Sequence, residues 1–279
     1  MIFFYMERIL GETGPSGREK MSHRTNTSLE NALYALKSFS GNNPELGVSE
    51  LSKKLDIGVS TAHRLLASLA DENFIVKNRE TQKYSLGLSI LELTNTVTEQ
   101  IHIIRESIPI LQRLRDETGE SAHLSIIEDT NVIYLQRLES PYNTPLETFL
   151  GKRNPVYCTG AGQTILAYQS ESEMDRVLAC DMKAHTSYTI TDTDRLKAKF
   201  AQIRKSGFTI SDQEYEKDFF SISSPVYNKE NSVIASMSIV GPVQRMKPAK
   251  DSLIDKVITA GRDLSKVIKQ RLASVNRKG

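Results

Sequence analysis

The sequence is poor in cysteine and in long apolar runs. It contains two cysteines, Cys158 and Cys180, in 279 residues. Two are too few for a disulfide framework, so we expect a protein of the reducing cytoplasm. No window approaches the roughly 20 apolar residues that cross a bilayer, so no membrane partner is expected. Charged residues interrupt the apolar opening "MIFFYMERIL" early, so we expect no signal peptide.

Excess charge of either sign is also missing. Lys and Arg number 36 against 34 Asp and Glu, which gives a net charge of +2. This balance excludes a uniformly basic coat but allows a local basic patch, because nucleic-acid binding depends on where the charges lie. Hydrophobic residues make up 39% and charged residues 25%, as in soluble globular proteins, and the length suffices for two domains.

The usual catalytic and metal-binding spacings are absent. His123, Cys158, Cys180 and His185 form no CxxC or HxxxH pattern, and no Ser/His/Asp order or carboxylate pair has supporting context. His123 lies in an apolar strand, where a core or pocket histidine is commoner than a metal ligand. We therefore expect no enzyme, no metal and no cofactor.

The first third of the chain predicts three helices and a hairpin. Residues 1–28 are expected to be a disordered leader, because 11–28 are rich in Gly, Ser, Thr and Arg. Met6 or Met21 is an alternative start. Leu29, Ala32, Leu33, Leu36 and Phe39 then recur at helical spacing. A short helix follows at Ser49–Leu55, and "DIGVS" predicts a turn with Ser60 as the N-cap of the next helix. "FIVKNRETQKYSL" predicts strand, polar turn and strand.

The helix in "VSTAHRLLASLADENF" has two different faces. Its leucines and alanines cluster on one side, and Ser60, Thr61, Arg64 and Ser68 lie opposite, with His63 at the border. Short hydroxyls allow close approach to another surface, and an arginine can bond a guanine edge or a phosphate bidentately. A helix after a tight turn and a short helix is typical of helix-turn-helix recognition.

The hairpin that follows would be a wing, with Lys77, Arg79 and Lys83 near its turn on adjacent phosphates. The predicted DNA-binding residues are Ser49, Ser60, Thr61, His63, Arg64, Ser68, Lys77, Arg79 and Lys83. The residues alone leave open a plain surface helix, or a winged module that binds protein.

The remaining chain predicts a linker helix and an α/β domain. The helix over 87–102 carries Leu88, Leu91, Val97 and Ile101, which suit packing on a partner helix. The expected later helices are 107–118, Gly160–Tyr168, Ser172–Cys180, Thr193–Ser206 and 250–273; the expected strands are 122–128, 131–138, 207–213, 221–227 and 232–240.

The segment "YCTGAGQT" is the strongest ligand signal of this second part. Thr159, Gly160, Ala161 and Gly162 precede a helix, where bare backbone N–H groups can receive a carboxylate. A glycine-rich helix start without a ligand is the alternative.

The segment "LSKKLDIGVSTAHRLLASLADENFIVKNRETQKYSLG" resembles the N-terminal domain of the IclR family of bacterial transcriptional regulators. "LRDETGESAHLSIIEDTNVIYLQRLES", "GKRNPVYCTGAGQTILAY", "TITDTDRL", "IRKSGFTISDQE", "SSPVYN" and "SMSIVGP" follow in the family's order. The resemblance covers residues 29–275.

The resemblance implies an α+β fold. Residues 1–28 would be a disordered leader, 29–86 a winged helix-turn-helix, 87–104 a linker helix, and 105–275 a GAF-like α/β effector-binding domain. It also implies a homodimer or dimer of dimers on double-stranded, pseudo-palindromic DNA.

The implied function is ligand-responsive transcriptional regulation, as a repressor of a catabolic operon released by a small carboxylic acid. "GKRNPVY" is similar to regulators of the 2-keto-3-deoxygluconate type, which suggests a sugar acid. An activator that responds to an aromatic or other acid stays open. So does a protein-binding winged helix fused to a small-molecule enzyme.

The effector residues implied by the resemblance are Thr159, Gly160, Ala161, Asp212, Ser221, Ser238 and Val240. Gly160 and Ala161 would supply backbone donors, and Asp212 would bond a ligand hydroxyl. The chain also departs from the family: Ser221 replaces a common Cys, Val240 a Ser, and Asp218 a Gly. Gly58-Val59 replaces Pro-Lys before the recognition helix. Loss of that lysine predicts a shallower salt dependence of DNA binding.

Overall fold

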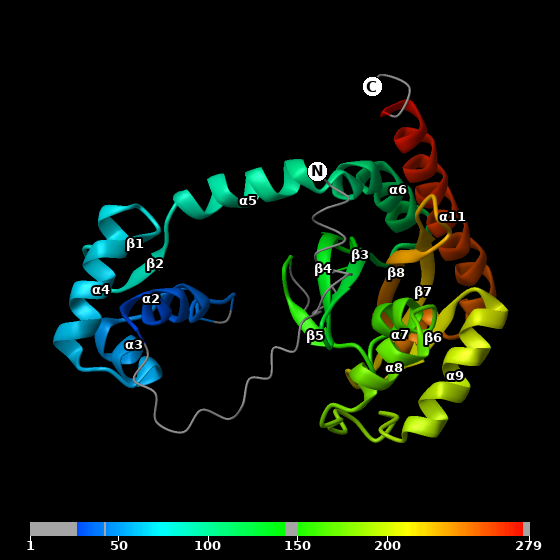
Figure 1. Ribbon diagram of the computed structural model, residues 1–279, viewed down its shortest axis with the longest axis horizontal. Coiled ribbons are helices and arrows are strands. Elements are labelled where there is room, and N and C mark those ends of the chain that lie inside the picture. Colours follow the sequence, from blue (N-terminus) through cyan, green and yellow to red (C-terminus); the bar gives the residue numbers. More distant parts are fainter. Residues whose placement is uncertain (1–26, 42, 143–149, 276–279) are drawn as a thin grey trace. The chain divides into compact units, whose positions relative to one another are not determined.

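The computed structural model describes residues 27–41, 43–142 and 150–275 (Figure 1). The chain divides into two compact units, Met1–Ile101 and His102–Gly279. Of the predicted disordered leader, residues 1–26 lie outside the described ranges. No helix among the described residues is long and apolar enough to cross a membrane.

The first unit contains the predicted three helices and hairpin. Its elements are α2 (Ser28–Lys37), α3 (Val48–Leu55), α4 (Val59–Asp71), β1 (Ile75–Lys77), β2 (Tyr84–Leu86) and α5 (Ser89–Gln100). Helix α2 begins at Ser28 because Thr27 and Glu30 form a capping box: the Thr27 hydroxyl accepts from the Glu30 N–H at 3.2 Å, and the Glu30 carboxylate accepts from the Thr27 N–H at 2.7 Å. Ser28 is therefore helical and not part of a disordered leader.

The predicted N-cap of the recognition helix is wrong by two residues. Asp56 ends α3 in the left-handed conformation, and Gly58 is the extended residue that precedes α4. The helix therefore starts at Val59 and has no side-chain cap, and Ser60 lies inside its first turn.

Apolar side chains from α2, α3, α4, β1 and β2 form the core of the first unit. Its fully or almost fully buried members include Ala35, Leu51, Leu66, Ile75 and Tyr84. The inner face of α2 differs from the predicted one.

Asn31 and Ala35 are the buried residues of α2, whereas Leu29 and Leu33 are 70% and 51% exposed. Each of these leucines lies two residues before a buried residue, and two residues along a helix correspond to about 200° of rotation. Leu29 and Leu33 therefore lie on the side of α2 away from the core. On α5, Leu91 and Val97 are also exposed, as is Leu88 just before it.

The second unit is built around one antiparallel sheet. Its elements are α6 (His102–Thr118), β3 (Ser121–Glu128), β4 (Asn131–Leu138), β5 (Arg153–Pro155), α7 (Gly160–Leu166), α8 (Glu171–Leu178), α9 (Thr193–Ser206), β6 (Thr209–Asp212), β7 (Phe219–Tyr227), β8 (Val233–Pro242), α10 (Val243–Met246) and α11 (Lys250–Val275). The sheet order is β5-β4-β3-β8-β7-β6.

The predicted strands of this unit are all present, and β5 and α10 have no counterpart among the predicted elements. Helix α6 starts at His102, five residues before the predicted start at 107. The chain leaves helical geometry at Ile101 (φ −90°, ψ 79°), inside the segment 87–104 that was predicted as one linker helix.

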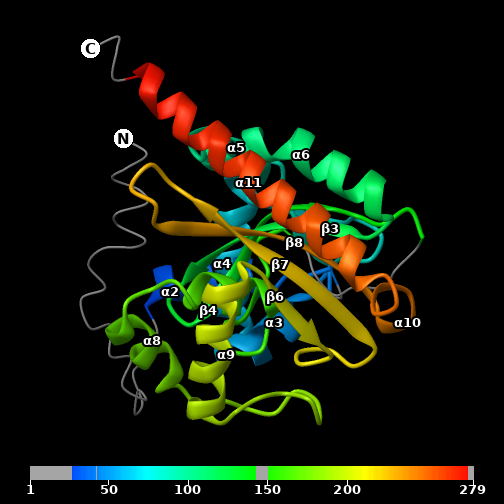
Figure 2. The ribbon, with the colours of Figure 1, turned by 90° about the vertical axis from the view of Figure 1, so that its right-hand side faces the viewer.

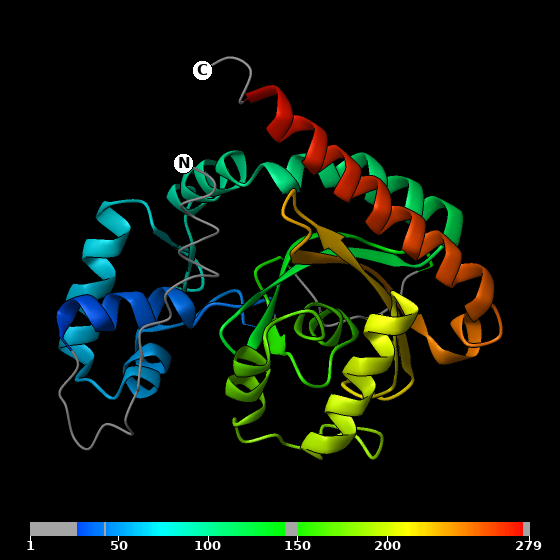
Figure 3. The same ribbon diagram turned by 45° about the vertical axis from the view of Figure 1, so that its right-hand side comes forward.

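The two faces of the sheet carry different side chains. Figures 2 and 3 show α6 and α11 side by side over one face, with α7 and α9 on the opposite side. Under α6 and α11 the strands present fully buried apolar residues such as Leu124, Ile222, Met237 and Ile239. The opposite face, toward α7, is rich in serine.

Helix α11 packs against β7 at a glycine. A Cβ on Gly261 would lie 2.3 Å from the Ser224 hydroxyl and 2.8 Å from the Pro225 carbonyl oxygen. The Ser224 hydroxyl also bonds the Val257 carbonyl at 2.7 Å, so this contact has little room to relax.

We predict that Gly261→Ala lowers the free energy of unfolding by about 1–3 kcal/mol through overpacking. Helix propensity alone predicts the opposite sign, a gain of about 1 kcal/mol. Chemical denaturation followed by circular dichroism decides between them, with Thr259→Ala at an exposed position of the same helix as control. A Gly261→Ala protein as stable as wild type would show that the close approach does not constrain the fold.

Candidate DNA-binding and effector-binding sites

Helix α4 shows the two faces that the sequence predicts. Ala62 and Leu66 are fully buried in the unit. On the other side His63 and Arg64 are exposed. Ser60 and Ser68 are exposed and Thr61 is half-buried, while Ser49 is exposed on the preceding helix α3. Small polar groups and one arginine thus form an open helical surface.

The hairpin turn holds three cations in different environments. Lys77 and Arg79 are exposed, and the Lys77 ammonium lies 5.7 Å from the centre of the Tyr84 ring. Lys83 is half-buried and pairs with Glu50 of α3 at 3.8 Å. The Gly47 N–H and then Lys83 lower the pKa of the Glu50 carboxyl. Lys83 is thus partly engaged within the unit.

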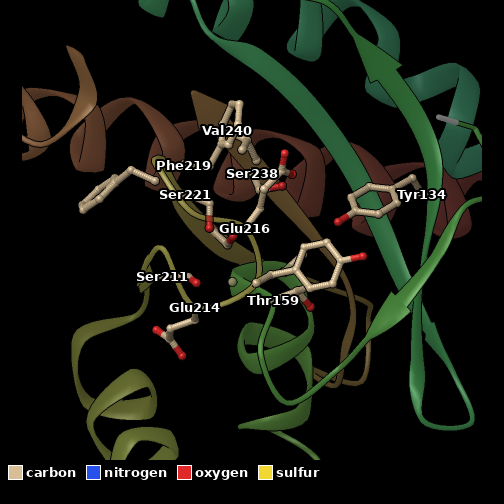
Figure 4. A pocket seen from close by; sticks show the side chains of 14 residues that line it. Tyr134, Thr159, Ser211, Glu214, Glu216, Phe219, Ser221, Ser238 and Val240 are labelled. Carbon is tan, nitrogen blue, oxygen red and sulfur yellow. The ribbon is translucent and has the colours of Figure 1, made fainter. Parts of the chain in front are cut away.

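A cavity of about 50 Å³ lies between the polar face of the sheet and the start of α7 (Figure 4). It is lined by Tyr134, Thr159, Gly160, Ala161, Ser211, Glu214, Tyr215, Glu216, Phe219, Phe220, Ser221, Ser223, Ser238 and Val240. Strands β4, β6, β7 and β8 supply one side, and the loop 213–218 supplies another. We call it the effector pocket, after the predicted effector residues among its lining.

Six of the seven predicted effector residues line this pocket, and Asp212 does not. Its carboxylate instead pairs with Lys247 at 2.7 Å. Successive side chains on a strand point to opposite faces, so Asp212 points away from the face that carries its neighbour Ser211. The expected bond from Asp212 to a ligand hydroxyl therefore has no geometric basis in this structure.

Sequence reasoning missed about half of the pocket, including Tyr134, Ser211, Glu214, Tyr215 and Ser223. A signal was present for two of them. Ser211 and Ser223 share the strand face of Ser221, because Ser211 pairs with Ser221 across the strands and Ser223 lies two residues along. The loop 213–218 left no comparable pattern.

Gly160 is enclosed by the serines of β7. A Cβ there would lie 2.5 Å from the Ser221 hydroxyl and 3.1 Å from the Ser223 hydroxyl. Only glycine lets the start of α7 approach the sheet this closely. The first N–H groups of a helix have no partner within it, so the backbone at Gly160 and Ala161 offers donors beside the pocket.

A row of polar side chains crosses the sheet beneath the pocket. His123 on β3 pairs in register with Ser238 on β8, which pairs with Ser223 on β7, and Ser223 pairs with Thr209 on β6. Ser223 is fully buried, and its hydroxyl has no hydrogen-bond partner among the described residues. Such a group favours a bound polar ligand or water.

His123 is fully buried and packs edge-on against the Tyr134 ring at 5.3 Å. Burial, and secondarily Arg137, lowers the pKa of the His123 imidazole to about 3. It is therefore neutral at physiological pH. Burial also raises the pKa of the Cys158 thiol to about 12, so this cysteine is not a nucleophile.

The only charged side chains that line the pocket, among the residues that the structure describes, are the carboxylates of Glu214 and Glu216. Glu214 accepts from the Gln163 amide at 2.7 Å and pairs with Lys199. A negatively charged ligand must therefore be received by neutral donors. The described ranges hold no cluster of three or more His, Cys, Asp or Glu suited to a metal.

Comparison with protein families decides the identity. Residues 95–266 match the model described as "Bacterial transcriptional regulator IclR C-terminal", and residues 28–79 match the IclR helix-turn-helix domain. The chain belongs to the IclR family. It is a DNA-binding transcriptional regulator with an effector-binding domain, and not an enzyme.

Several individual proteins are similar over most of this IclR-family chain. The HTH-type transcriptional regulator KdgR of Escherichia coli K12 is 29% identical over 227 residues, which is 81% of this chain and 86% of KdgR. XynR of the same strain is 29% identical over 224 residues, 80% of this chain and 89% of XynR.

Among solved structures, the regulator RHA06195 from Rhodococcus sp. RHA1 aligns with a TM-score of 0.78 at 24% identity, over 88% of this chain and 98% of that one. An IclR homologue from Microbacterium hydrocarbonoxydans, complexed with 4-hydroxybenzoate, also has a TM-score of 0.78, at 21% identity over 86% of this chain and 98% of that one. These structures confirm the fold.

The buried histidine generates a pH prediction. The pKa of His123 is about 3 in the fold, against an ordinary value of 6.5. The unfolded chain therefore takes up a proton below pH 6.5 that the folded chain does not, so stability is lost as the pH falls from 6.5 toward 3. At pH 5 this one group costs about 2 kcal/mol relative to neutral pH.

We predict that His123→Gln reduces the loss of unfolding free energy between pH 7 and pH 5 by about that amount. Urea denaturation at the two pH values measures it, with His185→Gln at an exposed position as control. An unchanged pH dependence in His123→Gln would mean that this imidazole does not resist protonation in the fold.

Proposed function

We propose that the chain is a repressor whose DNA binding is released by a small carboxylic acid, with a sugar acid as the favoured class. The observation that carries the proposal is the effector pocket, which joins backbone donors to a set of hydroxyls inside the regulatory domain. The "GKRNPVY" resemblance and the similarity to KdgR favour a sugar acid. The 4-hydroxybenzoate complex of a homologue shows one carboxylic acid bound to a protein of this fold.

On the DNA side, α4 is proposed to lie in the major groove. Ser60, Thr61, His63 and Ser68 allow close approach, and Arg64 reads a base edge or a phosphate. Ser49 on α3 contacts the phosphate backbone of the DNA, and Lys77, Arg79 and Lys83 of the wing add further phosphate contacts. Because Lys83 also pairs with Glu50, we expect Lys77 and Arg79 to contribute more of the salt dependence.

A homodimer or dimer of dimers is proposed because the first unit leaves large apolar side chains exposed. Leu29 and Leu33 on α2, with Leu88, Leu91 and Val97 at α5, are between 43% and 73% exposed. Apolar surface of this extent favours a partner surface. Two winged domains on a pseudo-palindrome would place their recognition helices in successive major grooves, about 34 Å apart.

In the effector pocket, the backbone N–H groups of Gly160 and Ala161 would receive the carboxylate. Thr159, Ser221 and Ser238 would add hydroxyls. Val240 would form an apolar wall. The carboxylate must be bound by neutral donors, because the carboxylates of Glu214 and Glu216 repel an anion. The acid releases DNA if it binds more tightly to an arrangement of the winged domains that does not fit the operator. To change the ratio of the two arrangements from 1:99 to 99:1, its affinities for them must differ by about 5.5 kcal/mol.

We predict that Arg64→Ala loses about 1–3 kcal/mol of affinity for the operator and relaxes specificity at one base position. Arg79→Ala should instead weaken binding uniformly across DNA sequences and lower the salt slope by about one. Fluorescence anisotropy on the operator and on random DNA at several salt concentrations separates the two, with Lys37→Ala on α2 as control. Unaltered operator affinity in Arg64→Ala would remove α4 from the DNA interface.

We predict that Gly160→Val abolishes acid-induced release while leaving DNA affinity intact, because its side chain would occupy the space beside Ser221 and Ser223. Release is followed by anisotropy of the DNA complex during acid titration. Gly41→Val is the matched control, since a Cβ at Gly41 meets nothing within 4 Å. A Gly160→Val protein that an acid still releases from DNA would place the effector elsewhere.

A further inference from the structure

A buried asparagine joins the two tyrosines that line the effector pocket. Asn154 on β5 is fully buried. Its amide Nδ2 donates to the hydroxyl of Tyr134 at 3.3 Å, and its Oδ1 accepts from the hydroxyl of Tyr215 at 3.0 Å. Tyr134 belongs to β4 and Tyr215 to the loop 213–218, so one side chain holds together two walls of the pocket.

The cost of burying this amide shows that the arrangement is specific. A buried amide without hydrogen bonds costs free energy, whereas an apolar side chain of similar size would not. The neighbours of Asn154 along the chain include Val156 and Tyr157, which belong to the apolar core of the unit. An apolar residue would therefore suit packing alone, and the two phenol hydroxyls account for the asparagine.

The amide also assigns opposite roles to the two hydroxyls. Tyr134 accepts from Asn154 and so keeps its own proton to donate. Tyr215 donates its proton to Asn154, so toward a ligand its hydroxyl can act only as an acceptor. In Figure 4 the hydroxyl of Tyr134 points toward the interior of the pocket. Burial raises the pKa of Tyr134 to about 12, which keeps it a neutral donor.

A donor beside an acceptor matches one functional group in particular, the alcohol hydroxyl, which both donates and accepts. We propose that Asn154 is a positioning residue that sets Tyr134 and Tyr215 as a donor–acceptor pair for a hydroxyl of the effector. The effector is then a hydroxylated carboxylic acid. This inference rests on the proposed function, and it names the residues that recognise a hydroxyl of the acid.

The opposite side of the pocket supports the same class independently. Ser211, Ser221 and Ser238 present hydroxyls from three adjacent strands (Figure 4). Ser223 lies two residues from Ser221 on the same face of β7, and its hydroxyl has no hydrogen-bond partner in the part of the chain that the structure describes. A polyhydroxylated ligand satisfies such groups, whereas an unsubstituted alkyl chain leaves them unpaired and costs affinity.

The test compares acids that differ only in hydroxyl groups. Isothermal titration calorimetry on the full chain uses propionate, lactate and glycerate as one matched series, and hexanoate and gluconate as a larger pair. We expect at least one series to bind with an affinity that rises with hydroxyl number, by roughly tenfold for each hydroxyl bonded.

Tyr134→Phe and Tyr215→Phe should each reduce the preference for the hydroxylated acid to within about threefold while leaving the affinity for its deoxy partner unchanged. Asn154→Leu should have the same effect, although Asn154 does not line the pocket. Tyr168→Phe is the control, because its hydroxyl bonds the Ile203 carbonyl away from the pocket. The ratio of affinities within a pair is the decisive readout, since general destabilisation weakens both members alike.

Equal affinity for hydroxylated and deoxy acids in the wild-type protein would overturn the inference and leave the acid effector standing. The inference also fails if Asn154→Leu and both Phe variants keep the wild-type ratio, or if they weaken both acids equally. If no acid binds and none releases DNA, the proposed function fails and the inference fails with it. Should Asn154→Leu not fold, Tyr215→Phe alone decides.

Discussion

The structure of the second unit, here called the regulatory unit, depends on the alternation of side chains in its six-stranded sheet. One face carries Leu124, Ile222, Met237 and Ile239, and buries them under α6 and α11. Removing such side chains from water supplies the main stabilising free energy of the unit. The opposite face can therefore carry serines and a neutral histidine, which would stabilise an apolar core poorly. Because side chains alternate along each strand, one face of the sheet stabilises the fold and the other is available for ligand binding. The same alternation places Asp212 on the face opposite to Ser211, where its carboxylate pairs with Lys247.

The polar face is usable because α7 comes very close to it. Gly160 has no Cβ, so the helix start reaches the serines of β7 and encloses the pocket. The loop 213–218 completes the enclosure through Glu214, which bonds Gln163, and Tyr215, which bonds Asn154. In the winged unit the same principle of two faces acts on a helix: Ala62 and Leu66 hold α4 in place, and Arg64 faces outward.

The sequence predicted most of the helices and strands and part of the effector pocket. The predictions that failed did so for physical reasons. Periodicity located almost every helix and strand, because burial of one face leaves a regular pattern. It misplaced the inner face of α2, since Leu29 and Leu33 fit a helical stripe whose buried side is decided by contacts with the other elements. Motif resemblance predicted Gly160, Ser221 and Ser238, which line the pocket. It missed Tyr134, Asn154 and Tyr215, which come from distant segments and meet only through the pairing of β4 with β5 and the path of the loop after β6.

We propose that acid binding in the regulatory unit controls DNA binding by the winged unit. The most direct measurement is fluorescence anisotropy of the full chain on labelled DNA from upstream of its own gene, titrated with sugar acids, other hydroxylated acids, keto acids and aromatic acids. We expect tight, salt-sensitive binding to DNA, from which a hydroxylated acid releases the protein. Tight binding that no acid in the panel changes would contradict it.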